Sequence, residues 1–251
     1  MSCKNTKEEY FPNGTIAKEY ELKNGRLDGV SKEYYENGKL KAVYLLKDGV
    51  LVDSSLFYNK EKSFIEKINY YLPKDSIRTK FFHEKGKLSS TGLFYKNQKI
   101  GKWNYFNKNG KLEKVFEYKN IEGEQYTNQS WYFNIKGETI KNLGNYYILK
   151  PIPKSLQSNE ALLLDFEYKP LLASNSEATI YMSSKINNDF SNLESVTLDA
   201  FPLYSHKAII EMSFKSKGRK NLRGFIKESI SKTDKSAKSK NTYFDMSIIV
   251  K

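Results

Sequence analysis

The sequence has little of what covalent, metal or redox sites require. Its 251 residues include one Cys and two His. One cysteine excludes an internal disulfide framework, and so few cysteines and histidines leave almost no scope for a zinc site. No apolar run approaches the roughly 20 residues with which a helix crosses a bilayer. These shortages predict a protein without a metal, a cofactor or a membrane-spanning helix.

Catalytic motifs are also missing. The sequence contains no Gly-x-Ser-x-Gly, P-loop or His-Glu-x-x-His pattern. Asp199, Ser205 and His206 lie near one another in the sequence, but they match no known catalytic pattern. We therefore expect a non-enzyme without catalytic residues.

Acidic residues are outnumbered by basic ones. The chain has 42 Lys+Arg against 29 Asp+Glu, which gives a net charge of +13. This charge, interleaved with tyrosines, makes nucleic-acid binding one hypothesis, which predicts an affinity that falls steeply with salt. Lysine predominates over arginine and no nucleic-acid-binding motif is present, so nucleic acid is not favoured as the partner. Another protein is the expected partner.

Glycine and proline are distributed unequally and divide the chain. Twelve of the 14 glycines lie in residues 1–144, whereas four of the six prolines follow. Pro151 and Pro153 predict an extended connector, because proline fixes φ and disfavours a helix before it. We therefore predict a flexible segment at 1–8, a repeat domain at 9–147, a linker at 148–158 and a second domain at 159–251.

The first domain repeats every 24 residues. An aromatic residue precedes a glycine by four positions at Tyr10/Gly14, Tyr34/Gly38, Phe82/Gly86 and Phe106/Gly110. The third copy lacks this glycine: Tyr58 retains the aromatic residue, but Lys62 stands at the glycine position. A repeat of this length is typical of a stacked array.

Each copy has the period of strands. Mostly apolar residues alternate with polar ones, as in Leu40, Ala42, Tyr44 and Leu46, a pattern that predicts strands with one buried face. Asn-Gly and Asp-Gly pairs supply the positive φ angles that tight hairpins need. Five copies predict a meander of about ten strands, and a weaker sixth copy at 131–137 is expected to close it.

Two segments show a family resemblance. Gly29-Val-Ser-Lys-Glu-Tyr-Tyr-Glu-Asn-Gly-Lys-Leu40 and Gly101-Lys-Trp-Asn-Tyr-Phe-Asn-Lys-Asn-Gly-Lys-Leu112 resemble the bacterial variant of the MORN repeat (membrane occupation and recognition nexus). The resemblance covers residues 9–144 and implies a β-meander used as a binding or scaffolding surface, sometimes near membranes, with no catalytic residues. The third copy lacks both glycines, so we expect an irregular sheet near residues 59–75.

Rings recur in register along the array and have two interpretations. They could form a ladder that grips a ligand, or they could be the cross-strand contacts that hold a thin sheet together. The second interpretation is favoured, because a single sheet must use large side chains as its core. The candidate binding surface consists of Tyr34, Phe57, Tyr58, Phe81, Phe82, Trp103, Tyr105 and Phe106.

The second domain alternates with period two in longer segments. Apolar residues share a face at Leu162–Tyr168, Ala178–Met182, Ala208–Phe214 and Phe244–Val250. With Ser195–Ala200 and Asn221–Ile230 these make about six strands, which favours a β-sandwich of immunoglobulin-like type. The fold class predicted for the chain is thus all-β: an antiparallel meander of MORN-like hairpins followed by an immunoglobulin-like β-sandwich.

Cys3 leads to a hypothesis about localisation. A Ser-Cys pair followed by polar residues resembles the start of a mature bacterial lipoprotein, in which the cysteine carries the lipid. Cys3 is then a candidate lipid-attachment residue, and the protein is a lipoprotein of the cell envelope or outer membrane. The alternative is a cytoplasmic protein of antitoxin or immunity type that binds a toxin. Both hypotheses expect a non-catalytic binding protein.

Overall fold

The computed structural model describes residues 5–173, 175–230 and 238–251. Two compact units are present, Met1–Val115 and Phe116–Lys251. The regular elements of the described residues are strands, apart from one 3-10 turn at Leu193–Ser195. The all-β prediction is therefore confirmed. Cys3, Met1 and Ser2 lie outside the described residues, as does most of the low-complexity segment that follows Ile230.

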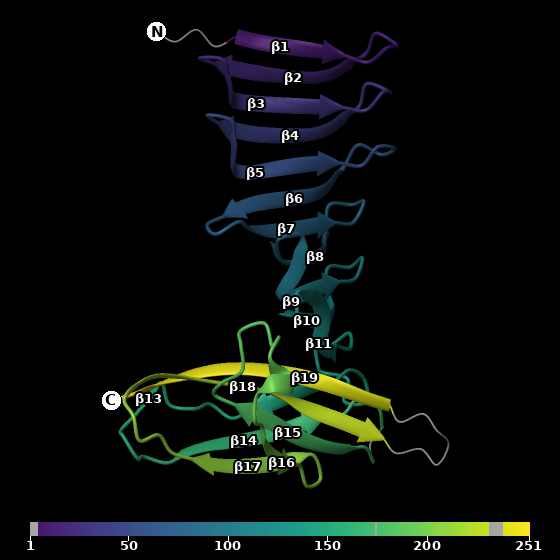
Figure 1. The fold of residues 1–251 in the computed structure, drawn as a ribbon. Coiled ribbons are helices and arrows are strands. Elements are labelled where there is room, and N and C mark those ends of the chain that lie inside the picture. Colours follow the sequence, from purple (N-terminus) through teal and green to yellow (C-terminus); the bar gives the residue numbers. More distant parts are fainter. Residues whose placement is uncertain (1–4, 174, 231–237) are drawn as a thin grey trace. The chain divides into compact units, whose positions relative to one another are not determined.

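The repeat region forms one antiparallel sheet whose strands pair in chain order (Figure 1). This confirms the predicted meander and gives it 11 strands. They are β1 (Asn5–Tyr10), β2 (Ile16–Lys23), β3 (Arg26–Tyr34), β4 (Leu40–Lys47), β5 (Val50–Tyr58), β6 (Ile65–Leu72), β7 (Ser76–Phe82), β8 (Leu88–Tyr95), β9 (Gln98–Phe106), β10 (Leu112–Ile121) and β11 (Glu124–Tyr132).

A common turn begins every copy of the repeat except the third. The N–H of Tyr35 bonds to the carbonyl of Lys39, and the N–H of Gly38 bonds back to Tyr35. The same pair of bonds recurs at the turns that begin with Phe11, His83 and Asn107, and again in the sixth copy at Asn134. Glycine is required at the fourth position because φ there is positive, +77° at Gly38.

The third copy keeps the sheet although it lacks the glycine. Its turn is one residue longer, since the N–H of Asn59 bonds to the carbonyl of Phe64, and Ser63 takes the left-handed conformation with φ 57°. Strand β6 then pairs with β7 without a register shift. The irregularity expected near residues 59–75 is thus confined to the longer turn and to the register shift at Glu66. That shift between β5 and β6 also occurs beside the turns of the neighbouring copies.

A second periodic position causes register shifts. Gly29 (φ 120°) and Gly101 (φ 64°) lie at shifts between β2 and β3 and between β8 and β9. Asp53 (φ 57°) occupies the same position in β5, also beside a shift. Ile77, at the equivalent place in β7, lies in a regular ladder. These bulges change which residues share a face, which simple alternation along the sequence does not show.

The C-terminal unit contains two further sheets. One has the order β12-β14-β17, and the other has the order β13-β19-β18-β15-β16. The strands are β12 (Tyr146–Leu149), β13 (Ser155–Leu156), β14 (Leu162–Lys169), β15 (Glu177–Ser183), β16 (Asp199–Pro202), β17 (Lys207–Met212), β18 (Gly218–Ile230) and β19 (Lys238–Val250).

One apolar core joins these two sheets. The predicted rows of β14, β15, β17 and β19 all contribute to it, and the rings of Phe166 and Phe244 lie 5.3 Å apart, centroid to centroid. The sandwich prediction is therefore supported by the packing. The strand expected at Ser195–Ala200 starts later, at Asp199, because residues 193–195 form the 3-10 turn.

The division between units falls earlier in the chain than composition suggested. Residues 116–147 belong with the C-terminal unit. There the side chain of Asn128 bonds to both the N–H and the carbonyl of Tyr243, as a neighbouring strand would. The predicted linker at 148–158 is also largely built into the sandwich, since it supplies the end of β12 and all of β13, which pairs with β19.

A buried carboxylate lies inside the C-terminal unit. Glu228 of β18 is fully buried and accepts four hydrogen bonds. Its Oε1 receives the N–H of Leu172 and the hydroxyl of Ser176, and its Oε2 receives the N–H of Leu171 and the hydroxyl of Tyr168, all within 2.7–3.0 Å. The acid thereby fixes the segment that follows β14.

Candidate binding surface

The cross-strand register decides which side chains share a face of the repeat sheet. Residues directly opposed in neighbouring strands point to the same side. Phe57 opposes Lys67, Lys67 opposes Phe81, Phe81 opposes Ser90, and Ser90 opposes Tyr105. These residues therefore form one row across β5 to β9. We call this side of the sheet the ring face.

A second row of the ring face contains small side chains beneath larger ones. Ser55 and Thr79 are buried, at 0% and 1% exposure. Trp103 lies over Gly92, where an added Cβ would come within 2.3 Å of the indole. Trp103 is itself fully buried and donates its Nε1–H to the carbonyl of Leu93 at 3.1 Å. Small residues thus make room for rings on this side.

The eight predicted rings do not form one surface. Phe57, Phe81, Trp103 and Tyr105 lie on the ring face, whereas Tyr34, Tyr58, Phe82 and Phe106 lie on the opposite face. Phe57 and Tyr58 are consecutive in β5, as are Phe81 and Phe82 in β7. The register shift beside each pair places its extra residue in the neighbouring strand, so the side chains of each pair alternate. Tyr34 illustrates the opposite face, because its hydroxyl bonds to Glu19, which also pairs with Lys32.

Burial separates the rings further. Trp103 belongs to the core, in agreement with the favoured interpretation of the stripe. Phe57, Phe81 and Tyr105 are half-buried and keep part of each ring on the surface. Trp103 joins Phe81, Phe94 and Tyr105 in one cluster, with centroid distances of 6.4, 4.9 and 6.5 Å. The ring face therefore presents partly exposed rings on a rigid aromatic base.

Lysines lie among these rings, and sequence reasoning missed them. The Nζ of Lys67 is 3.8 Å from the centroid of Phe57, and that of Lys99 is 4.6 Å from the centroid of Trp103. Burial lowers the pKa of Lys67. Such cation–π contacts strengthen where water is excluded. The turn before β6 is one residue longer than the others, so Lys67 takes the place in the sheet that Ala42 and Ser90 hold in their copies. The exact 24-residue spacing instead relates Lys67 to Val43 and Thr91, which lie on the opposite face.

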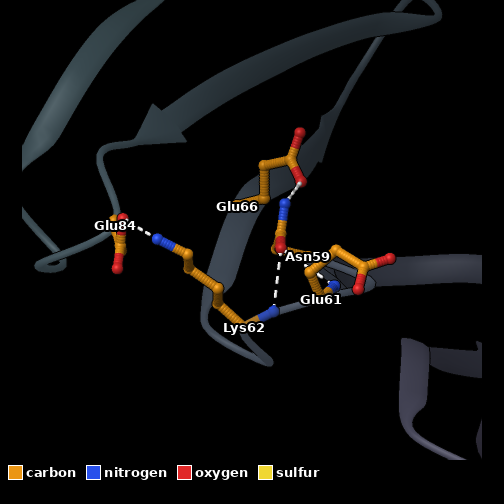
Figure 2. A network of polar contacts seen from close by, with 5 residues as sticks. All are labelled: Asn59, Glu61, Lys62, Glu66 and Glu84. Atoms are coloured by element: carbon orange, nitrogen blue, oxygen red, sulfur yellow. Dashed lines mark hydrogen bonds and ion pairs between the residues drawn. The ribbon is translucent and has the colours of Figure 1, made fainter.

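The turns that begin the repeats form a second ordered feature, the turn stack. Each of the first four turns bonds to the next one, about one repeat further along the chain. Asn13 donates to the carbonyl of Glu36, Lys62 pairs with Glu84 at 2.7 Å, and Lys87 donates to the carbonyl of Asn109. Figure 2 shows the third turn, where the Asn59 side chain accepts the N–H groups of Glu61 and Lys62 and donates to Glu66.

The other sequence candidates do not assemble into a site. His206 lies in the turn before β17 and its Nε2 is 3.1 Å from the carbonyl of Ser176, a backbone contact rather than a catalytic one. Within residues 5–173, 175–230 and 238–251, no group of three His, Cys, Asp or Glu side chains could hold a metal ion. None of the described helical segments is long and apolar enough to span a membrane.

Comparison with known families assigns the repeats. Residues 27–48 and 99–120 match the family model of the MORN repeat variant. These segments contain the shift positions Gly29 and Gly101 and the hairpins that follow them. No curated protein matches the chain. The repeats are thus identified by two independent segments 72 residues, or three repeat lengths, apart.

Proposed function

We propose, from the premise that this chain carries MORN repeats of the variant type, that its ring face is a docking surface for another protein. MORN repeats generally serve as protein- or membrane-binding modules, and no enzyme family is indicated for this chain. The observation that supports the proposal is the row of half-exposed rings and lysines on a rigid aromatic base.

Aromatic residues suit such a surface for a physical reason. They bury a large area while ordering few rotatable bonds, so they dominate the energetics of many interfaces. The sheet also leaves part of these rings accessible at β5 to β9, where Phe57, Phe81 and Tyr105 are only half-buried. The ring face would therefore act as a scaffold, with binding energy concentrated at Phe57, Phe81 and Tyr105.

Paired substitutions test this proposal because consecutive rings lie on opposite faces. The chain would be co-expressed with the products of neighbouring genes, and stable complexes would be purified. Phe81→Ala should weaken a complex that Phe82→Ala leaves intact, since both remove a half-buried ring of the same size. Equal effects of the two substitutions would argue against a role for the ring face. Rescue of growth by a stoichiometric complex would support the antitoxin type of partner.

The C-terminal unit fits an immunoglobulin-like adaptor. Its strand order β12-β14-β17 facing β19-β18-β15-β16 supports the A-B-E and G-F-C-C′ arrangement of such sandwiches. We propose that this unit is a second, non-catalytic adaptor beside the repeats. Its partner would bind separately from that of the ring face.

Lipidation of Cys3 is part of the same proposal. A diacylglyceryl group on this cysteine would hold the repeats at an envelope membrane, because two acyl chains anchor a protein stably whereas one binds only marginally. Fractionation of the full-length gene product, with Cys3→Ser for comparison, tests this. The wild type should sediment with membranes and the variant should not. Equal recovery of both in the soluble fraction would favour the cytoplasmic alternative.

A further inference from the structure

At the centre of the ring face lies Lys67, a cation set between two aromatic rings. Lys67 opposes a phenylalanine on each side, Phe57 in β5 and Phe81 in β7. Its ammonium lies over the Phe57 ring. Among the described residues, no ion pair involves Lys67.

The charges of the sheet differ along its length. Near β2 to β4, lysines meet acids: Lys18 pairs with Glu9, and Lys41 with Glu33. Between residues 50 and 106 the acids are Asp53, Glu61, Glu66, Asp75 and Glu84. Glu61, Asp75 and Glu84 lie in turns, and Asp53 lies at the bulge of β5. Glu66 lies in the bulge of β6, where it bonds to Asn59, and its charge raises the pKa of Lys67 against the effect of burial. Among the described residues, the ring face between Phe57 and Phe81 thus presents the ammonium of Lys67 without a carboxylate ion-paired to it.

We propose that this part of the ring face binds an extended peptide whose acidic side chain pairs with Lys67 and whose neighbouring apolar side chains cover Phe57 and Phe81. The inference deepens the proposed function by naming the chemistry of the partner. Charge complementarity selects an acid, because a carboxylate would gain a charge-assisted hydrogen bond at a half-buried ammonium. The rings select apolar neighbours.

The spacing of the peptide follows from the geometry of the sheet. Phe57 and Phe81 lie one strand away from Lys67 on either side, at about 4.8 Å each. In an extended peptide that crosses the strands, side chains on the same side are about 6.6 Å apart. Alternate residues of the peptide therefore match neighbouring strands of the sheet most closely. The expected motif is apolar-x-acid-x-apolar, with the acid at Lys67 and the apolar residues at Phe57 and Phe81.

A random dodecapeptide display library, selected on the immobilised full-length chain, provides the test. We expect enrichment of the motif apolar-x-acid-x-apolar. One enriched peptide, synthesised with a fluorescent label, would then be titrated against variants. Lys67→Met should weaken its binding by about tenfold or more, and its affinity should fall as salt rises. Because burial lowers the pKa of Lys67, the uncharged methionine should fold well.

Lys80→Met is the matched control. Lys80 is also half-buried and lies 5.1 Å from the centroid of Tyr70, but it opposes Ile68 and so belongs to the opposite face. This variant should bind the peptide like the wild type. Equal losses with both variants would overturn the assignment to the ring face.

Other outcomes separate the inference from the proposed function. Enriched peptides without an acid, which Phe81→Ala weakens and Lys67→Met does not, would overturn the inference and leave the docking function. No enrichment at all would contradict both. Phosphatidylglycerol vesicles and single-stranded RNA would be tested as phosphate ligands. If the chain bound either of them, Lys67→Met abolished that binding and no acidic peptide was enriched, the ring face would bind phosphate and the peptide inference would be wrong.

Discussion

Glu228 shows how much one buried side chain can demand of its surroundings. A carboxylate only accepts hydrogen bonds, and here four donors converge on its two oxygens. Glu228→Gln would place an amide NH2 opposite two of these donors. We expect a loss of about 2–4 kcal/mol in the free energy of unfolding, measured by urea denaturation.

Glu167→Gln provides the control for this substitution. Glu167 is exposed, and its nearest cation, Lys207, lies 3.8 Å away. The loss there should stay below about 1 kcal/mol, since exposed ion pairs contribute little. Similar losses for both substitutions would mean that the four bonds to Glu228 do not stabilise the fold.

Lys240 predicts a dependence of stability on pH. Its ammonium lies 3.8 Å from the centroid of the Tyr126 ring and donates to the Tyr126 hydroxyl and to the carbonyl of Thr127. Burial lowers the pKa of Lys240 from 10.5 to about 8. Between these values the unfolded chain binds more protons than the folded chain, so the contribution of Lys240 to stability rises with pH.

Urea denaturation of the wild type and of Lys240→Met at pH 7.5, 8.5 and 9.5 checks this. The free energy of unfolding of the wild type should increase relative to that of the variant across the series. The series stops below pH 10 because tyrosines ionise above it. Tyr126 has a raised pKa and contacts Lys240, so its ionisation would differ between the wild type and the variant. A difference that stays constant from pH 7.5 to 9.5 would contradict the lowered pKa.

At the scale of the element, substitution by glycine at the periodic bulge position should change stability in opposite directions in two copies of the repeat. Asp53 adopts a left-handed conformation that costs a side-chain residue more than a glycine. We expect Asp53→Gly to stabilise the protein by about 0.5–1 kcal/mol. Ile77→Gly, at the same repeat position in a regular ladder, should destabilise it by more than about 1 kcal/mol. Thermal unfolding that shifts in the same direction for both would contradict this account.

The turn stack allows a comparison of two kinds of polar contact. Asn59 satisfies two backbone N–H groups of its own turn, whereas the Lys62–Glu84 pair is largely exposed (Figure 2). Asn59→Ala should therefore cost about 1 kcal/mol, and Lys62→Met less than about 0.5 kcal/mol. The midpoint of urea denaturation measures both. A larger loss for Lys62→Met would show that the contacts between turns dominate.

The elements themselves were predictable from the sequence, but the faces of the meander were not. Strands and turns follow from alternation and from glycines such as Gly38, which are local properties. The side on which Lys67 lies depends on the longer third turn and on the bulge in β6, where one extra residue shifts the register. In the sandwich no such shift interrupts the row of Leu162, Leu164, Phe166 and Tyr168, and all four residues are buried as predicted.

The candidate site was predictable in part. The rings could be found because they recur every 24 residues, but their division between two faces requires the cross-strand pairs. Lys67 could not be distinguished from solvent-exposed lysines, since its burial results from Phe57 and Phe81 on neighbouring strands. The donors to Glu228 come from segments more than 50 residues away in the chain, which local patterns do not reveal.

At the scale of the whole molecule, the repeats predict tolerance to the loss of a complete copy. In a stacked array each copy contacts only its neighbours. Deletion of residues 35–58, one full repeat, joins Tyr34 to Asn59 and preserves the order of strands and turns. We expect a folded protein whose melting temperature stays within about 5 °C of the wild type.

Deletion of residues 47–58 removes only half a repeat and is the control. It would move the turn at Asn59 to the opposite end of the strands and so break the bonds between this turn and its neighbours. We expect a much lower melting temperature or aggregation. Circular dichroism and thermal melts distinguish the two deletions, and equal stability would mean that the 24-residue unit is not the unit of folding.

The chain-order pairing of the meander has a consequence for biosynthesis. Each strand from β2 to β9 finds its partners within the adjacent repeat, so a hairpin can close soon after it leaves the ribosome. By contrast, β13 pairs with β19, which is completed only at Val250. The amino-terminal repeats can therefore acquire their structure early in translation, whereas the sandwich must wait until β19 has been synthesised.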